Sequence, residues 1–145
     1  MNSYLEMKQR HQREVNDLPL FFAFSNEQFN ESLQQMGLTS KDTDQLRSLG
    51  IGGGFYHKDN ADKIHGTFQR HENERNEAIE SDKKGNGYIY EMFLYELNNH
   101  EYGYTGDESD TFDTLGFTHA EVENNKALKF GFDKAVKRIM TDNDC

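Results

Sequence analysis

Tryptophan is absent from this sequence of 145 residues, proline and cysteine occur once each, and long apolar runs are missing. The single cysteine, Cys145, excludes a disulfide framework within the chain. No apolar stretch approaches the ~18 residues that a membrane-spanning helix needs, and the N-terminus lacks the apolar core of a signal peptide. Proline interrupts helices, and the sequence contains it only at Pro19. Helices are therefore expected almost everywhere else. We therefore expect a cytoplasmic, mainly helical protein.

The most informative absence is that of basic residues in one long interval. Between Lys84 and Lys126 there is no lysine or arginine, while nine carboxylates occupy the same interval. The formal net charge of the chain is -10, and outside the interval 17 acids face 16 bases. A concentrated negative field attracts basic partners and repels phosphates, which disfavours direct contact with nucleic acid and with anionic membranes. The sequence therefore indicates a kind of partner, namely a basic protein surface.

Apolar spacing and capping signals predict one compact, mainly α-helical domain over residues 1–145, with about six helices and one short β-hairpin near Phe21 or Phe55. The expected helices cover residues 3–17, 25–36, 44–49, 61–81, 88–99, 107–115 and 125–140. The segment 18–24 is the most apolar of the chain and is predicted to be a buried connector or a short strand. Residues 88–99 are apolar around most of the helix circumference, which predicts the central helix.

One junction pattern occurs twice. Met36-Gly37-Leu38-Thr39 and Leu115-Gly116-Phe117-Thr118 each place a glycine, an apolar residue and a threonine after a predicted helix. Glycine commonly ends a helix, and threonine commonly caps the next one. We interpret the two segments as a common helix junction used twice rather than as a duplication.

Tyrosines accompany the carboxylates of the acidic interval. Tyr102 and Tyr104 lie beside Gly103 and Gly106 in a predicted turn, so they need not belong to the core. Tyrosine offers contact area at a small entropic cost, and carboxylates recruit Arg or Lys across an interface. The alternative is that these charges only keep the chain soluble. The predicted partner-binding residues are Glu96, Glu101, Tyr102, Tyr104, Asp107, Glu108, Asp110 and Asp113.

The segment from Asp82 to Phe93 resembles the calcium-binding loop of an EF-hand. Asp82, Asn86 and Gly87 match the first, fifth and sixth positions of such a loop. Lys84 at the third position repels a cation, however, and Phe93 at the twelfth cannot supply the bidentate carboxylate. The pattern therefore favours a tight helix connection over a weak calcium site. The carboxylates near residues 107–113 likewise suit a helix start without any metal.

Signals for catalysis are sparse. No two of the six histidines show the i, i+4 spacing of a helical metal site. His100 and Glu101 follow the predicted central helix beside two asparagines, so a small metal-dependent enzyme or hydrolase would be centred there. The stretch Gly50–Gly54 lacks the Lys-Ser/Thr of a phosphate loop and is predicted to be a mobile loop. No cofactor and no metal ion is predicted.

Three segments carry a resemblance to known sequences. Residues 14–29, residues 97–102 (Leu-Asn-Asn-His-Glu-Tyr) and residues 115–118 resemble an uncharacterised family of small acidic proteins. The family is associated with Gram-positive and gut bacteria and with their phages and mobile elements. The resemblance implies a context in which small acidic proteins inhibit host nucleases or other defence proteins, by presenting carboxylates where the target expects DNA phosphates.

The leading hypothesis is a non-enzymatic acidic module that binds a basic surface, such as that of a host nucleic-acid enzyme or defence protein. The alternatives are the enzyme centred on His100 and Glu101 and a weak calcium-binding protein.

Overall fold

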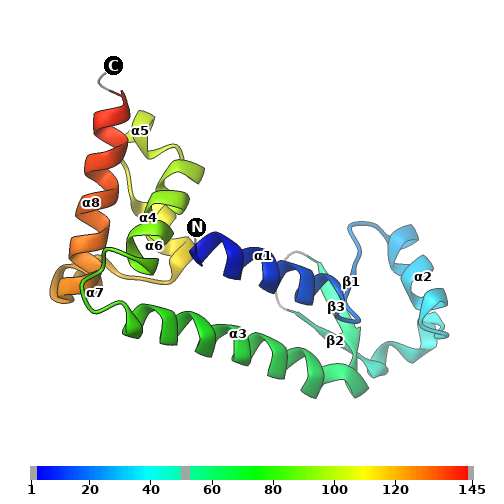
Figure 1. Ribbon diagram of the computed structural model, residues 1–145. Helices are drawn as coiled ribbons and strands as arrows, with labels where there is room; N and C mark the ends of the chain where they lie inside the picture. The colour runs from blue at the N-terminus through cyan, green and yellow to red at the C-terminus, as the bar shows by residue number, and fades with distance from the viewer. Residues whose placement is uncertain (1–2, 50–52, 144–145) are drawn as a thin grey trace. The chain divides into compact units, whose positions relative to one another are not determined.

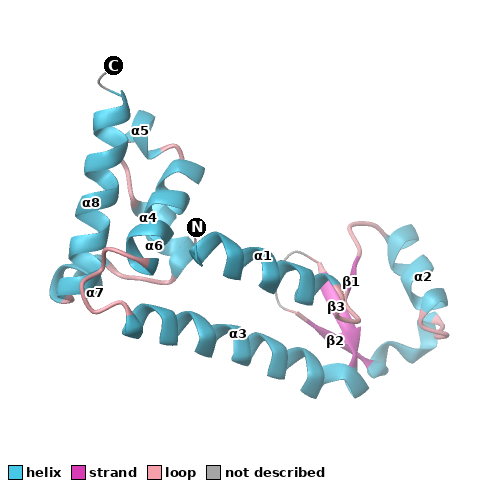
Figure 2. Cartoon of the chain, viewed as in Figure 1, coloured by secondary structure: helices cyan, strands magenta, loops and turns pink. Residues whose placement is uncertain are grey.

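The computed structural model describes residues 3–49 and 53–143 and is mainly helical, with a small antiparallel sheet (Figures 1 and 2), which confirms the predicted fold class. The chain divides into two compact units, each described by itself below. Unit 1 contains residues 1–10 and 73–145, and unit 2 contains residues 11–72. Helices α1 (Ser3–Asn16) and α3 (Ala61–Ser81) each contribute to both units. That residues 1–145 form a single domain stays a prediction.

Unit 2 is built around three short strands. They are β1 (Phe21–Phe22), β2 (Leu46–Ser48) and β3 (Gly54–His57), joined by α2 (Asn26–Gln35) and the 3-10 helices η1 (Ser40–Gln45) and η2 (Lys58–Asn60). The strand order is β1-β3-β2, and both pairings are antiparallel. The sheet confirms the expected hairpin, and it brings both expected positions together because Phe21 pairs with Phe55. The short helix predicted to run through Leu49 is wrong from Leu46 onward, where β2 forms instead.

The two faces of this sheet pack against different elements. Leu18 and Ile64 pack with Tyr56 in one buried cluster. Phe55, the next residue along β3, packs against Phe29 of α2 with ring centroids 5.2 Å apart. Successive side chains of a strand point to opposite faces of the sheet. Tyr56 and Phe55, which are neighbours in β3, therefore pack on opposite faces.

The apolar segment at residues 18–24 is less buried than predicted. Phe22 is 50% exposed and Phe24 is 78% exposed, although Leu18 is buried. The segment alternates between the core and the surface because it forms an edge strand and then a helix cap. Ser25 accepts a hydrogen bond from the Gln28 backbone N–H, and Gln28 in turn accepts one from the Phe24 N–H. This reciprocal capping confirms the predicted start of α2.

Unit 1 is helical and is centred on α4 (Tyr88–Asn99). The other helices are α5 (Tyr102–Thr105), α6 (Ser109–Leu115), α7 (His119–Asn124) and α8 (Lys126–Asn143). Ile89, Phe93 and Leu97 of α4 are fully buried, so the central helix is confirmed. Helix α8 lies close to the start of α4, because a Cβ atom added to Gly131 would lie 2.5 Å from Ile89 Cγ2.

The connection between α3 and α4 depends on one carboxylate. Asp82 accepts hydrogen bonds from the backbone N–H groups of Gly85, Gly87 and Ile89, at 3.1, 3.1 and 2.9 Å. These bonds satisfy N–H groups at the start of α4 that have no partner within the helix. The predicted tight helix connection is therefore confirmed, and both Asp82 oxygens already accept hydrogen bonds.

The junction predicted twice is present in both units. Gly37 after α2 and Gly116 after α6 have φ angles of 75° and 79°, which suit glycine. Thr39 and Thr118 then form capping boxes with Asp42 and Glu121. Residues 50–52 of the glycine-rich stretch lie outside the described residues, as does Cys145, and the loop predicted to reach Gly54 is wrong there because Gly54 begins β3.

Candidate functional site

An acidic surface runs from the end of α4 to α6. We define it by the predicted residues that remain on this part of unit 1, which are Glu101, Tyr102, Tyr104, Asp107, Glu108, Asp110 and Asp113. Four of its carboxylates are exposed, and Tyr104 is 94% exposed. The chain therefore brings together seven of the eight predicted partner-binding residues within one continuous segment.

The backbone of α5 turns Tyr104 outward. Glu101 before this single helical turn has a φ angle of 59°, and Gly106 after it has a φ angle of 65°. The Tyr104 N–H donates to the Glu101 carbonyl at 2.9 Å, and the Gly106 N–H donates to the Tyr102 carbonyl at 2.8 Å. Two left-handed residues thus bracket one closed turn, and the tyrosine within it projects into solvent while Tyr102 is partly buried.

Local hydrogen bonds keep the start of α6 negatively charged. Asp107 Oδ1 accepts a hydrogen bond from the Ser109 backbone N–H at 2.9 Å. That bond, with smaller contributions from the Ser109 side chain and from His119, lowers the pKa of Asp107. Glu108 Oε1 lies 3.1 Å from His119 Nε2. Burial, and secondarily the charge of Glu108, raises the pKa of Tyr102, which therefore stays neutral at physiological pH.

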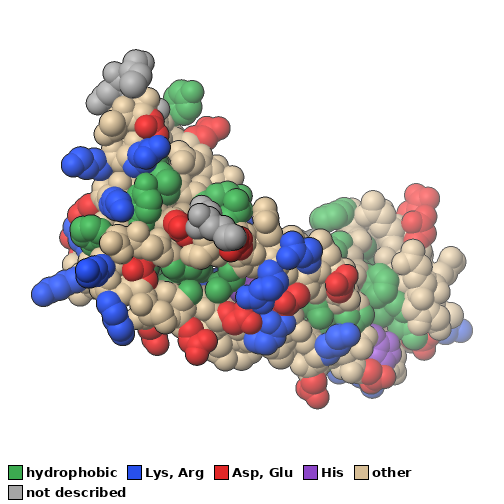
Figure 3. Space-filling view, viewed as in Figure 1, with side chains coloured by type: hydrophobic (Ala, Val, Ile, Leu, Met, Phe, Trp, Pro, Cys, Tyr) green, Lys and Arg blue, Asp and Glu red, His purple; other side chains and the backbone are tan. Residues whose placement is uncertain are grey.

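The acidic surface carries charge without cationic partners. In residues 3–49 and 53–143, no Lys or Arg forms an ion pair with Glu101, Asp107, Asp110 or Asp113. Lys129 of α8 pairs with Glu123 and Asp133, and Figure 3 shows Lys and Arg side chains over α8. The four exposed carboxylates therefore keep their negative charge without a direct Lys or Arg partner among the described residues.

Glu96 corrects the prediction. Its side chain is fully buried, with Oε1 3.2 Å from Lys8 Nζ and no hydrogen-bond partner at Oε2. It cannot contact a partner at the acidic surface. The sequence spacing already indicated that Glu96 faces the core. It lies four residues after Met92 and three after Phe93, both of which are buried.

Both ring nitrogens of His100 contact groups other than Glu101. The His100 Nδ1–H donates to the Glu96 carbonyl at 2.8 Å, and Nε2 lies 3.2 Å from Thr114 Oγ1. Both ring nitrogens therefore hold the end of α4 against α6, while Glu101 is exposed. In the part of the chain that the structure describes, no three His, Cys, Asp or Glu side chains are grouped so that they could hold a metal ion. The same residues include no helix with the length and apolar character needed to cross a membrane.

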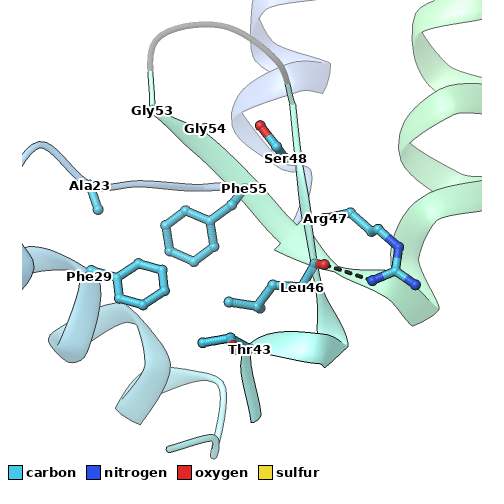
Figure 4. A pocket seen from close by; sticks show the side chains of 9 residues that line it. All are labelled: Ala23, Phe29, Thr43, Leu46, Arg47, Ser48, Gly53, Gly54 and Phe55. Atoms are coloured by element: carbon cyan, nitrogen blue, oxygen red, sulfur yellow. Dashed lines mark hydrogen bonds between the residues drawn. The ribbon is translucent and has the colours of Figure 1, made fainter. Parts of the chain in front are cut away.

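Unit 2 contains a separate apolar pocket, which sequence reasoning missed. It has a volume of about 370 Å³ and lies beside the rings of Phe29 and Phe55 (Figure 4). Leu46 also points toward these rings, whereas Arg47 extends away from them and donates to the carbonyls of Asp44 and Leu46. Its walls come from separate segments of the chain, so no local motif could have revealed it. Such a pocket can accept an apolar group.

Comparison with known proteins gives one match. The model of a protein family, described as a family of unknown function (DUF7659), matches residues 3–138. No curated protein and no solved structure matches the chain. The match begins with α1 and extends into α8, so it includes elements of both units.

Proposed function

The chain belongs to this family of unknown function, and we propose that it is a non-enzymatic binding module whose acidic surface engages a basic protein surface. One observation carries the proposal: four exposed carboxylates without a Lys or Arg partner lie in the same segment as Tyr104, whose side chain is 94% exposed. Their charge has no counterpart within the described chain, so a basic partner can supply it.

The chemistry of the surface supports both recognition and anchoring. Unpaired carboxylates accelerate the approach of a basic partner and disfavour acidic ones. An exposed tyrosine supplies the large contact area that is typical of interface residues with a strong effect on affinity. Tyr102 lies partly buried next to it and can hold the α5 turn in place.

The target class that this chemistry suits best is an enzyme that binds nucleic acid in a Lys- and Arg-lined groove. Carboxylates can occupy positions that such a groove offers to phosphates. We place this inhibition in the cytoplasm of a bacterium, with the protein encoded by a phage or mobile element. The support for this context is the charge of the surface and the resemblance to small acidic proteins of such sources.

The proposal is tested by charge reversal with a matched control. Asp107, Asp110 and Asp113 are replaced together by lysine, and a second variant carries lysine at Glu27, Glu31 and Asp44, which are exposed acids of unit 2. Both variants change the net charge equally. We expect wild type and control to capture the same basic proteins from a bacterial lysate at low salt, and the acidic-surface variant to lose them.

The captured proteins are then purified, and affinity and nuclease or polymerase inhibition are measured directly. Affinity should fall steeply with salt, because exposed charges are screened within about 10 Å at 0.1 M. Tyr104→Ala should weaken binding by about tenfold or more while leaving the melting temperature unchanged. Equal binding by all variants, or binding that ignores salt, would contradict the proposal.

A further inference from the structure

The basic residues of helix α8 fall into two groups. Lys129 and Arg138 pair with carboxylates of α7 and of α8 itself, at distances of 3.0 to 3.2 Å. The remaining basic residues of the helix are exposed, and within residues 3–49 and 53–143 they form no ion pair. They are Lys126, Lys134 and Lys137.

These three lysines share one face of α8 with an exposed aromatic ring. Phe130, which is 50% exposed, lies four residues after Lys126, four before Lys134 and seven before Lys137. Residues at such spacings lie on the same side of a helix. Lys134 Nζ lies 4.4 Å from the centroid of the Tyr90 ring, and this contact orients the ammonium group without removing its charge. We call Lys126, Phe130, Lys134 and Lys137 the basic face.

Anions of the same copy do not neutralise the basic face. Asp133 lies on this side of the helix, but its carboxylate contacts Lys129 at 3.2 Å. Lys134 and Lys137 are three residues apart and therefore repel each other. Among the described residues, no ion pair joins α8 to the carboxylates of the acidic surface. The basic face therefore offers positive charge and an aromatic ring to a molecule from outside.

The acidic surface has the composition that suits the basic face. It presents four exposed carboxylates without a Lys or Arg partner among the described residues, and the nearby Tyr104 is 94% exposed. Each surface combines unpaired charges of one sign with one exposed ring, and the two signs are opposite. A nucleic acid is a less suitable occupant, because three lysines offer few phosphate contacts and affinity for a polyanion grows with their number.

We propose that the basic face of one copy binds the acidic surface of a second copy. Two chains with a formal net charge of -10 repel each other at long range. At 0.1 M salt this repulsion is screened beyond about 10 Å, so the opposite charges in contact dominate. The contact joins two different surfaces and is therefore heterologous.

Self-association of this kind does not require any other partner. Its regulatory consequence, in contrast, rests on the proposed function, because an acidic surface that is covered by a second copy is closed to a basic target. The protein would then bind its target in competition with itself, and dilution would favour the target.

Sedimentation velocity of the purified protein at 0.1 M salt tests the contact. The basic-face variant carries Lys126→Glu, Lys134→Glu and Lys137→Glu, and the acidic-surface variant carries Asp107→Lys, Asp110→Lys and Asp113→Lys. We expect wild type to associate as its concentration rises, and each variant alone to self-associate at least tenfold more weakly.

An equimolar mixture of the two variants is the most specific part of this test. Each variant retains the surface that the other has lost, so the mixture should associate at least tenfold more strongly than either variant alone. Both variants keep a negative net charge, since three charge reversals change the value of -10 by only six. Attraction between net charges therefore cannot produce the recovery.

A matched control places the same charge reversal in unit 2. It carries Lys41→Glu, Lys58→Glu and Lys63→Glu, which replace exposed lysines. This control should self-associate as wild type does. Phe130→Ser removes only the half-exposed ring and should weaken self-association about tenfold without lowering the melting temperature.

Nuclear magnetic resonance of the wild type keeps the test valid if a variant does not fold. Amide signals of residues 101–113 and 126–141 should shift together as the concentration rises. The proposal is overturned if wild type stays monomeric up to about 1 mM, if the shifts lie outside these two segments, or if the mixture of variants associates no better than its components. Binding of a DNA oligonucleotide at the basic face without self-association would assign this face to nucleic acid and would overturn it as well.

This outcome is separate from that of the lysate capture. Purified protein contains no other partner, so failure of self-association leaves the proposed function untouched. Failure of the capture experiment likewise leaves the contact between two copies in place.

Discussion

The two ends of α1 dock through acids that differ in burial and in partners, since Glu96 is fully buried and Glu14 is partly exposed. In unit 1, Ser3 to Arg10 packs on α4 and covers Glu96, whose Oε2 has no hydrogen-bond partner. In unit 2, the rest of the helix supplies Glu14, whose Oε2 is shared by His71 and Arg70. Glu96 therefore has one oxygen without a hydrogen-bond partner, whereas one oxygen of Glu14 contacts two partners. Whether such an acid stabilises a fold depends on its partners as well as on its burial.

The neighbours of the two acids also differ in how they respond to pH. Glu96 lies near tyrosines, which ionise in alkali, whereas Glu14 lies between a histidine and an arginine. Burial raises the pKa of Tyr4, which Glu96 raises further, and it raises the pKa of Tyr88 to about 12. The unit 1 contact is therefore expected to be sensitive to alkali.

The largest expected effect comes from removing the anchor of the unit 1 contact. Tyr4 is 6% exposed and packs against the rings of Tyr88 and Tyr95, at centroid distances of 5.6 and 5.9 Å. Tyr4→Ala should lower the free energy of unfolding by about 3 kcal/mol, as large-to-small changes of buried aromatics do. Urea denaturation followed by circular dichroism measures this value.

Tyr4→Phe is the control, since it keeps the ring and removes only the hydroxyl group near Glu96. Its effect should stay below about 1 kcal/mol. Equal losses in the two variants would mean that the hydroxyl group, and not aromatic packing, anchors the first residues of α1.

The next largest loss of stability is expected for substitution of Glu14. Glu14→Ala leaves the buried His71 without its Nε2 partner, whereas the half-exposed Arg70 can turn to water. We expect a loss of about 2 kcal/mol, mainly from the unsatisfied imidazole. Glu14→Gln retains an acceptor for His71 and should lose less. If both changes are neutral at pH 7.5 in the same denaturation assay, the unit 2 contact does not depend on this carboxylate.

A smaller loss of stability is expected at alkaline pH, and it should affect the contact of α1 with α4 in unit 1. The folded-state pKa of Tyr88 lies above its ordinary value of 10, so the unfolded chain ionises first. The stability from the neutral phenol is complete below pH 10 and is lost as the pH rises toward 12. By pH 10.5 the loss should reach roughly 1 kcal/mol. Denaturation curves from pH 8 to 10.5 measure it, and Tyr88→Phe should reduce the dependence while the part due to Tyr4 remains. An unchanged slope in that variant would assign the alkaline loss to other groups.

The smallest expected effect is at Glu96. Glu96→Met replaces an incompletely satisfied carboxylate with an apolar side chain of similar size, while Lys8 is exposed enough to reach water. The change in unfolding free energy should lie within about 1 kcal/mol of zero, because replacing a buried ion pair by apolar groups is often neutral or stabilising. A loss as large as that expected for Glu14→Ala would remove the contrast between the two acids.

Sequence reasoning succeeded where the determinants are local. The bounds of α3 and α4, the Ser25 cap and the junctions at Gly37 and Gly116 follow from residues within one or two turns of each other. The exposure of Tyr104 follows equally from its glycine-flanked turn. These features agree with the prediction because side chain and backbone partners are neighbours in the sequence.

Features that depend on distant residues were not predictable in the same way. Strand β2 forms because β3 is there to pair with it, although its residues looked helical. The spacing of Glu96 from Met92 and Phe93 indicates that it faces the core, but its contact with the distant Lys8 depends on the tertiary structure. The stack of His11 on His71 likewise joins residues of two separate helices, and no local pattern contains these partners.

The exposure of Tyr104 also gives the protein a chemical handle. Reagents that nitrate or iodinate tyrosine attack the phenolate, so their rate depends on access and on the ease of ionisation. Tyr4 and Tyr88 are protected on both counts, since they are buried and their pKa values are raised. A brief treatment at mildly alkaline pH should therefore mark Tyr104 before them, and a spectroscopic label would then sit within the acidic surface without any change to the sequence.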